Sequence, residues 1–296
     1  MEQTRVQELV ARHASSEGVH DTPFDGVQLF RLCKPVERLA GVYSPSLCII
    51  VQGSKRAYLG DAAFTYDHEH YMCATMPLPV EGEVPHATPE KPVLGLLISL
   101  ETRAMAEMLI EYEAGARPLP NPKAAETIPG LVVAAWSEAF VTALLRLLQL
   151  LDDPLSVRLL GPGRLRELFF AVIQGKAGPM IRHSFGTSHN LSRALSYLRN
   201  NLEEPLSIDD LAEHAGMSRA VFDRRFREAT THSPLQFIKL LRLSEAAMHI
   251  AQGMPISQAA ESVGYGSASQ FSREFKRHFG KSPRQWGKGA AREPFV

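Results

Sequence analysis

Residues 207–239 read SIDDLAEHAGMSRAVFDRRFREATTHSPLQFIK, and residues 256–288 read ISQAAESVGYGSASQFSREFKRHFGKSPRQWGK. These two stretches form an internal repeat, and a repeat found in a sequence constrains the fold before any other feature. Gly216 of the first copy corresponds to Gly264 of the second, and the match continues, with one extra residue in the second copy, to the end of both stretches. The last third of the chain is therefore predicted to contain two similar folded units.

Each copy has the residue pattern of a helix-turn-helix unit. In the first copy, Ser207 and Asp210 have the spacing of a capping box, which starts a helix. Gly216 follows where a left-handed residue ends that helix, and Ser218 is placed to cap the next one. Two phenylalanines four residues apart then give the second helix an apolar face. We predict helix-turn-helix units at residues 207–229 and 256–279.

The outward face of the second helix in each unit has a composition that suits DNA. Arg pairs with guanine O6 and N7, Gln pairs with adenine and Ser serves either base edge, whereas Lys suits phosphates. The predicted DNA-contacting residues are Arg219, Ala220, Asp223, Arg224 and Arg227 in the first unit and Ser269, Gln270, Ser272, Arg273 and Lys276 in the second. Ordinary helical hairpins with solvated charged faces are the alternative, and the repetition of caps, turns and basic faces disfavours it.

The segment between the two units is predicted to be one long helix. Its apolar residues recur along one side of residues 234–251, at Leu235, Ile238, Leu241, Ala246 and Ile250. Such a helix would hold the two units at a fixed separation. Two recognition helices one DNA turn apart, ~34 Å, enter successive major grooves on one face of the duplex.

The charges divide the chain into an acidic and a basic part. The whole chain has 32 Lys+Arg and 32 Asp+Glu, and residues 186–296 hold 15 of the basic and 11 of the acidic residues, a net charge of +4. This asymmetry is typical of a nucleic-acid-binding domain joined to another domain. The N-terminus shows no signal peptide, and the apolar run Leu144–Leu151 is too short to span a membrane. We expect a reducing, cytoplasmic environment.

Residues 1–185 are predicted to form a separate domain of the α+β class. Short runs rich in β-branched and aromatic residues between about 24 and 100 predict a small β-barrel or sandwich. Helices are predicted at Glu101–Ala114, Ala134–Leu151 and Arg164–Ile173, the last bounded by Gly161-Pro162-Gly163, with a linker near Ser184–Asn190. The apolar face Phe140–Leu151 either covers the β-domain or pairs with a second chain, and we predict that it supports a homodimer.

Residues 256–265 and 269–280, followed by Ser282-Pro283, resemble the signature of AraC-type (AraC/XylS) transcription regulators. The N-terminal part resembles the cupin-like regulatory domain of a large bacterial subgroup, at Tyr43–Leu47, Val51–Lys55, Leu78–Val80 and Arg164–Glu167. The resemblance implies a cytoplasmic, usually dimeric regulator that binds double-stranded DNA, with a cupin-like barrel for a small effector and with RNA polymerase as a further partner. Thr231, where the family usually has Gly, and Asp223 depart from the pattern.

The interior of the barrel supplies the candidate effector pocket, for which we name Ile49, Val51, Phe64, Tyr66 and Tyr71. Packing in the core is the alternative role for these side chains. Two cysteines, Cys48 and Cys73, lie in predicted strands. They are interpreted as buried packing thiols, and the alternative is that one of them senses redox state or electrophiles.

A metal site is the remaining candidate for chemistry. His68, His70 and His86 have the pattern through which many cupin enzymes bind a metal, but a hairpin turn with solvated histidines is the preferred interpretation. We expect no metal and no cofactor, and the chain has no P-loop and no nucleophile elbow. The predicted function is a sequence-specific DNA-binding transcription regulator, activating or repressing, and not an enzyme. The alternative is a cupin-type metalloenzyme fused to a helical module.

Overall fold

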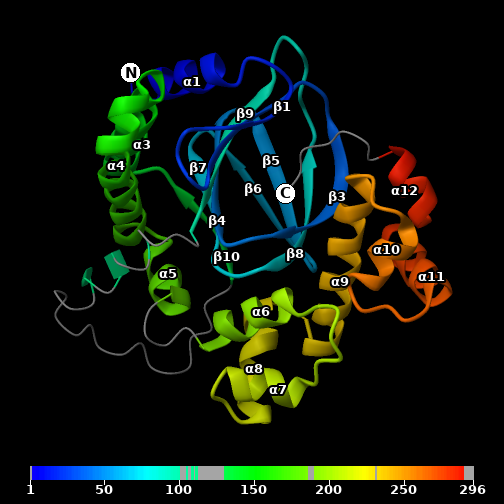
Figure 1. The fold of residues 1–296 in the computed structure, drawn as a ribbon. Coiled ribbons are helices and arrows are strands. Elements are labelled where there is room, and N and C mark those ends of the chain that lie inside the picture. The colour runs from blue at the N-terminus through cyan, green and yellow to red at the C-terminus, as the bar shows by residue number, and fades with distance from the viewer. Residues whose placement is uncertain are drawn as a thin grey trace.

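The computed structural model describes residues 2–100, 130–185, 190–230 and 232–289, together with isolated positions between 105 and 112. An N-terminal domain of two β-sheets and flanking helices is followed by an all-helical C-terminal domain (Figure 1). This arrangement confirms the predicted two-domain α+β class. Among these residues no helix is both long enough and apolar enough to cross a membrane.

Two antiparallel sheets face each other in the N-terminal domain. The first has the strand order β1-β2-β9-β4-β7-β10 and the second has the order β3-β8-β5-β6. The strands are β1 Gly18–Asp21, β2 Val27–Leu32, β3 Val36–Tyr43, β4 Ser46–Gln52, β5 Ser54–Leu59, β6 Ala62–Asp67, β7 His70–Ala74, β8 Leu78–Val84, β9 Val93–Ser99 and β10 Leu131–Ala135. The domain is therefore an open sandwich and not the closed cupin-like barrel of the prediction, because no ladder of backbone hydrogen bonds joins the described strands of one sheet to those of the other.

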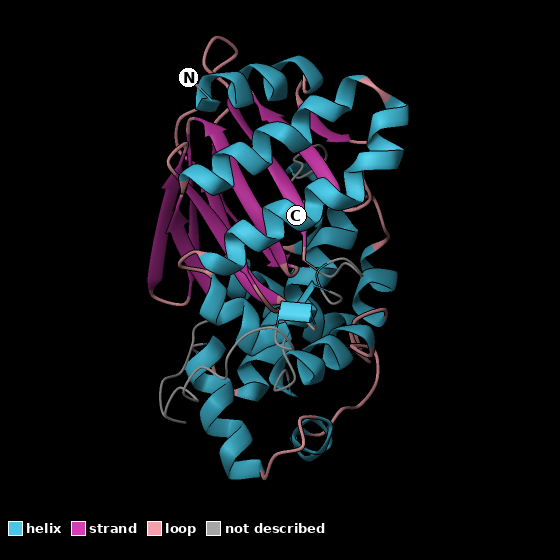
Figure 2. Cartoon of the chain, turned by 90° about the vertical axis from the view of Figure 1, so that its left-hand side faces the viewer, coloured by secondary structure: helices cyan, strands magenta, loops and turns pink. Residues whose placement is uncertain are grey.

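Helices cover the outer face of the six-stranded sheet, as Figure 2 shows. They are α1 Glu2–His13, α3 Glu138–Leu148, the 3-10 turn η1 Gln149–Asp152 and α4 Pro154–Gln174, after which α5 Gly178–Phe185 ends the domain. Alternate side chains of a strand point to opposite faces. Ile49 and Val51 of β4 consequently pack against these helices, whereas Cys48 and Ile50 face the second sheet.

The helical prediction for this region needs two corrections. The helix predicted from Ala134 begins at Glu138, because residues 131–135 form β10 and pair with β7. The helix predicted from Arg164 begins at Pro154 and continues through Pro162, since Gly161 is buried directly against the Phe24 ring and leaves no room for a chain reversal. Of the helix predicted at Glu101–Ala114, the described positions Met105, Met108, Leu109, Glu111 and Tyr112 are helical, and the rest lies outside the described residues, as does most of the predicted linker.

The apolar face predicted for a dimer is buried inside the chain. Its seven large apolar side chains are all buried, and all except Val141 belong to the core beneath α3 and the six-stranded sheet: Phe140, Val141, Leu144, Leu145, Leu147, Leu148 and Leu151. Their burial within one chain corrects the prediction that this face supports a homodimer. Its role is the alternative one, in which it covers the β-domain.

The C-terminal domain consists of seven helices in the described ranges. They are α6 Asn190–Asn200, α7 Ile208–His214, α8 Arg219–Thr230, α9 Pro234–Ala251, α10 Ile256–Glu261, α11 Ala268–Phe279 and α12 Pro283–Gly289. The predicted units at 207–229 and 256–279 coincide with α7–α8 and α10–α11. The predicted joining helix is α9, which begins at a capping box formed by Ser233 and Gln236.

Helix α9 packs against the N-terminal domain as well as against both helix-turn-helix units. Phe237 and Leu241 join a core that continues into the space between the sheets, and Leu243 and Ile250 join the core of the second helix-turn-helix unit. Leu235 departs from the predicted apolar side, because it lies in the first turn and is 68% exposed. The two domains form one packed body around this helix (Figure 1).

Gly264 gives the first testable prediction. Its φ is +81°, and a Cβ placed there would lie 2.7 Å from the backbone oxygen of Leu202. Replacing Gly264 with Ala should lower the free energy of unfolding by about 1–3 kcal/mol, because both the backbone conformation and the contact become strained. Gly266→Ala is the control, since its Cβ would meet nothing within 4 Å. Urea denaturation measures both variants, and equal stabilities would contradict the assignment.

Candidate functional site

The two helix-turn-helix turns have the same hydrogen-bond geometry. The Met217 N–H donates to the Ala212 carbonyl at 2.9 Å, and the Tyr265 N–H donates to the Ala260 carbonyl at 3.0 Å. Gly216 and Gly264 supply the positive φ that each turn requires, with values of +58° and +81°. Equivalent turns place the second helix of each unit in an equivalent position.

Two phenylalanines fix each second helix on its unit. Phe222 and Phe226 are fully buried with ring centroids 5.3 Å apart, and Phe271 and Phe275 repeat the arrangement at 5.3 Å. Residues four apart lie on one face of a helix. The opposite faces of α8 and α11 therefore point to solvent, as the sequence predicts.

The ten predicted DNA-contacting residues lie on these outward faces. Eight of them are exposed and two, Asp223 and Ser272, are half-buried. An extended basic surface on a second helix is what a helix-turn-helix protein offers to the major groove. Thr231, the predicted departure from the family pattern, lies outside the described residues.

Ion pairs occupy part of the first face. Arg219 donates to Asp209 at 2.9 Å and to Asp223 at 3.1 Å. Asp223 thus orients Arg219. Arg224 and Arg227 form no ion pair within the described ranges, so their guanidinium groups are available to a ligand.

The carboxylate of Glu274 holds side chains at the outward face of α11 in place. Glu274 accepts hydrogen bonds from Tyr265 Oη at 3.0 Å and Gln270 Nε2 at 3.4 Å, and it pairs with Lys239 Nζ at 3.0 Å. Burial opposes its charge, but these donors outweigh burial and hold the pKa of Glu274 below its ordinary value. Gln270 is consequently held in place, and Arg273 and Lys276 next to it form no ion pair in the described part of the chain.

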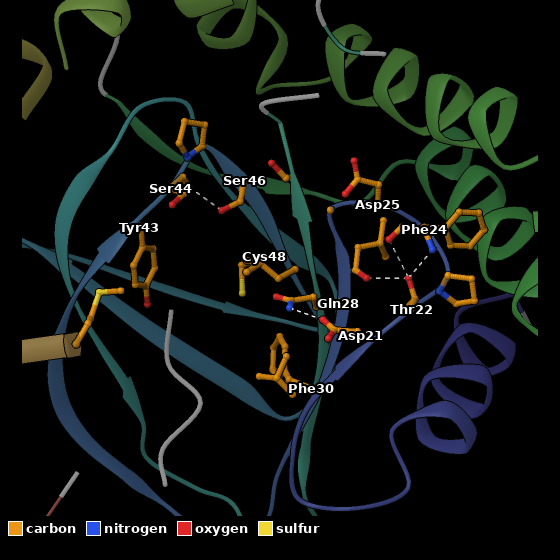
Figure 3. A pocket seen from close by; sticks show the side chains of 18 of the residues that line it. Asp21, Thr22, Phe24, Asp25, Gln28, Phe30, Tyr43, Ser44, Ser46 and Cys48 are labelled. Carbon is orange, nitrogen blue, oxygen red and sulfur yellow. Dashed lines mark hydrogen bonds between the residues drawn. The ribbon is translucent and has the colours of Figure 1, made fainter. Parts of the chain in front are cut away.

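A cavity of about 800 Å³ lies between the sandwich and the helical domain. Figure 3 shows its lining, in which apolar side chains such as Phe24 and Phe30 are interspersed with polar ones such as Gln28 and Ser46. Most of the lining comes from β1, β2, the loop between them and the turn between β3 and β4, and Arg199 of α6 and Met248 of α9 close it from the helical domain. A concave site that combines apolar side chains with convergent polar groups has the character of a small-molecule site.

Lys55 and Tyr43 are a buried cation and a buried hydroxyl group in the lining of the cavity. Lys55 is 6% exposed, and its Nζ lies 5.0 Å from the centre of the Tyr43 ring. Burial alone would lower the pKa of Lys55, but attraction to Tyr43 and Cys48 outweighs it and raises the pKa, so Lys55 is a cation at neutral pH. Burial raises the pKa of Tyr43 and keeps its hydroxyl protonated.

Arg199 connects the cavity to the helix that joins the two units. Its Nη1 donates to Ser44 Oγ at 2.8 Å, and its Nε donates to Glu245 of α9 at 3.2 Å. Glu245 is 9% exposed, so its carboxylate is largely buried. Arg199 therefore links Ser44 to α9 through two hydrogen bonds.

The residues predicted for the effector pocket do not line this cavity. Ile49, Val51 and Tyr71 face the helices on the outer side of the six-stranded sheet, whereas Tyr66 and Phe64 pack between the sheets. Strand parity explains the difference, because the neighbours of Ile49 along β4 are the residues that face inward. Lys55 was missed, although a lysine two residues before Ala57 on the buried side of β5 was a visible signal.

The surroundings of the candidate metal-binding histidines and of Cys48 and Cys73 can be read from the structure. His68 and Glu69 form the turn between β6 and β7, which confirms the hairpin interpretation, and His70 Nδ1 lies 2.9 Å from Asp67. No three His, Cys, Asp or Glu side chains of the described residues cluster as metal ligands. Cys73 is fully buried against the outer helices, and Cys48 lines the cavity.

The two matched units, each with an exposed basic face, define a DNA-binding protein of the helix-turn-helix class. Residues 211–289 match a helix-turn-helix domain family, and residues 23–180 match the AraC-type transcriptional regulator N-terminus. The second match covers more than half of the chain. The protein belongs to the AraC-type transcriptional regulators and is a DNA-binding transcription regulator.

Individual relatives agree with this family. The chain is 33% identical over 107 residues to the HTH-type transcriptional regulator ArgR of Pseudomonas aeruginosa, covering 36% of this chain but only 32% of ArgR. It is 32% identical over 93 residues to the multiple antibiotic resistance protein MarA of Escherichia coli, covering 31% of this chain and 73% of MarA. The chain spans only about a third of the length of ArgR.

One solved structure covers nearly the whole chain. The crystal structure of unsaturated fatty acid bound ToxT from Vibrio cholerae has a TM-score of 0.56 and 13% sequence identity, and it covers 90% of this chain and 97% of ToxT. At this identity the likeness shows a shared fold. The order of a sheet-rich N-terminal domain and a helical C-terminal domain is common to both proteins.

Glu274 gives a prediction about pH. The pKa of Glu274 is lower in the folded protein than in the unfolded chain, where it is about 4.3. The charged carboxylate therefore stabilises the fold fully above the unfolded pKa. This stabilisation is lost as the pH falls through the folded pKa. Glu274→Gln should cost about 1 kcal/mol of unfolding free energy at pH 7 and should flatten the loss of stability below pH 5. Glu261→Gln, an exposed carboxylate on α10, is the control. Parallel stability profiles for Glu274→Gln and the wild type would contradict this account.

Proposed function

We propose that α8 and α11 each enter one of two successive major grooves, and that Arg224 and Arg273 each read a base there. The supporting observation is the equivalence of the two units, since the same turn and the same phenylalanine pair hold both helices. Arg224 and Arg273 occupy corresponding positions and are exposed. A bidentate contact from Arg to guanine is the commonest specific contact in protein–DNA complexes.

Alanine variants test the division of work between the two helices. Loss of one bidentate contact costs about 1–3 kcal/mol, so Arg273→Ala should weaken binding and relax preference at one operator position. Arg224→Ala should do the same about one helical turn away, with the smaller effect, because ion pairs of Arg219 and Asp223 occupy part of the first face. The measurement is binding to a library of single-base operator variants.

Lys276→Ala is the matched control. If Lys276 holds a phosphate, this change should weaken all operator variants alike and lower the slope of log affinity against log salt by about one. Binding is therefore measured at two salt concentrations. A uniform loss across the library for the two arginine variants would show that they contact only the backbone, which would contradict base reading.

We also propose that the cavity is the effector site. Its supporting features are its volume, its lining of apolar and polar side chains and the cationic Lys55. The related fold of ToxT has been solved with a bound unsaturated fatty acid. We infer an effector that is mainly apolar and carries one oxygen acceptor. Binding would shift the population of DNA-binding geometries through the contacts of Ser44 and Glu245 with Arg199.

Self-association stays a prediction, and we now infer that α4, and not α3, supplies the dimer surface. Four of the six exposed large apolar side chains in the described ranges lie on this helix: Leu155, Leu159, Leu160 and Phe170. An apolar face of this kind marks an interaction site, and we infer a second copy of the chain as its occupant. Light scattering of the wild type and of Leu159→Glu tests it, and a monomeric wild type would contradict it.

We infer the remaining properties from the family. The protein acts on duplex DNA, so we place it in the bacterial cytoplasm, where RNA polymerase is its expected further partner. We expect a regulator and not an enzyme, because the family is one of transcription regulators. Mapping of bound genomic sites with and without candidate effectors tests these inferences, and no change in any transcript on deletion would contradict them.

A further inference from the structure

The three cysteines have different surroundings. Cys73 is fully buried in the apolar core beneath the outer helices, and burial raises the pKa of its thiol far above the ordinary value. Cys33 is half-buried in the loop after β2. Cys48 alone of these three lines the cavity between the domains, where it projects from β4 (Figure 3). A molecule that enters the cavity therefore meets the Cys48 sulfur.

Two neighbouring groups act on the Cys48 side chain. Tyr66 Oη donates a hydrogen bond to Cys48 Sγ at 3.4 Å, and both residues are buried. Lys55 is cationic, and Cys48 is one of the groups whose attraction keeps it so. A cation and a hydrogen-bond donor near sulfur are the features that distinguish a reactive cysteine from an inert packing thiol.

A third group points to a ligand with an oxygen acceptor. Tyr43 is 8% exposed and lines the cavity beside Lys55, and its Oη donates no hydrogen bond to another described residue. Gly82 gives this hydroxyl its space, because a Cβ at Gly82 would lie only 2.7 Å from Tyr43 Oη. A buried hydroxyl that donates no hydrogen bond is costly. A carbonyl oxygen placed between Tyr43 and Lys55 would accept from both.

We propose that Cys48 is a covalent attachment site for α,β-unsaturated carbonyl compounds that enter the cavity between the two domains. The Cys48 thiolate attacks the β-carbon, and a carbon–sulfur bond forms as the carbon–carbon π bond breaks. The electron pair moves to the carbonyl oxygen as an enolate, which Tyr43 and Lys55 stabilise by hydrogen bonding. The α-carbon then takes up the proton that the thiol lost. The net reaction adds S–H across the double bond and needs no oxidant.

The position of the adduct also suggests a consequence for DNA binding. Arg199 and Met248 of the helical domain line the same cavity, and Arg199 bonds Ser44 on one side and Glu245 of α9 on the other. An adduct that fills this space displaces these contacts. This consequence rests on the proposed effector role of the cavity, whereas the chemistry at Cys48 does not.

The test is modification of the full-length Cys33→Ser protein by methyl vinyl ketone, followed by intact mass and peptide mapping over time. Cys48 should be modified at least about tenfold faster than Cys73. Tyr43→Phe and Lys55→Met should each slow the adduct at Cys48 by about tenfold, because each removes a donor to the enolate oxygen. Tyr58→Phe is the control, since the hydroxyl of Tyr58 bonds Glu83 and does not line the cavity.

Circular dichroism and thermal melting verify that each variant is folded, and Cys48→Ser in the same background supplies the blank. The proposal is overturned if native Cys48 stays unmodified, if Cys73 reacts as fast, or if Tyr43→Phe and Lys55→Met both leave the rate unchanged. Operator binding of the same samples separates the two claims. An adduct with unaltered operator binding supports the site and contradicts only the proposed control of DNA binding, whereas no adduct contradicts the site alone.

Discussion

The burial of two phenylalanines beneath each recognition helix is the contact on which the DNA-binding surface depends. Each phenylalanine pair contacts α9, either directly or through one further side chain. Phe226 meets Phe237 of α9 edge-on with centroids 5.1 Å apart, and Phe275 packs on Trp286, whose Nε1 donates to the Ala247 carbonyl of α9 at 3.1 Å. Aromatic contacts of this size contribute stability and fix orientation. Helix α9 is thus the common support of both units.

The same helix also contacts the N-terminal domain. It packs against β3 and β8, and its Glu245 is held by Arg199, which also bonds Ser44 at the rim of the cavity. Packed elements move as units and transmit small displacements. Under the proposed effector role of the cavity, a ligand there would act on the support of both recognition helices at once.

The sequence predicted the C-terminal domain well, because its signals are local. Ser207 with Asp210, Gly216 and the phenylalanine spacing each determine structure within a few residues. The N-terminal domain was harder. The pairing of β10 with β7 joins strands more than fifty residues apart, and no local pattern contains it. Ile49 and Val51, named for the effector pocket, do not line the cavity, whereas Ser46 and Cys48 on the other face of β4 do, since the sequence shows alternation but not which face meets the cavity.

The central claim is that α9 holds the two recognition helices at one fixed separation. With 18 residues, this helix is ~27 Å long and does not stretch. The most direct measurement is the affinity of the protein for operators in which base pairs are inserted between the two half-sites. Insertion of about five base pairs, half a turn, should reduce the affinity to that of a single half-site. Equal affinity for every spacing would contradict the claim.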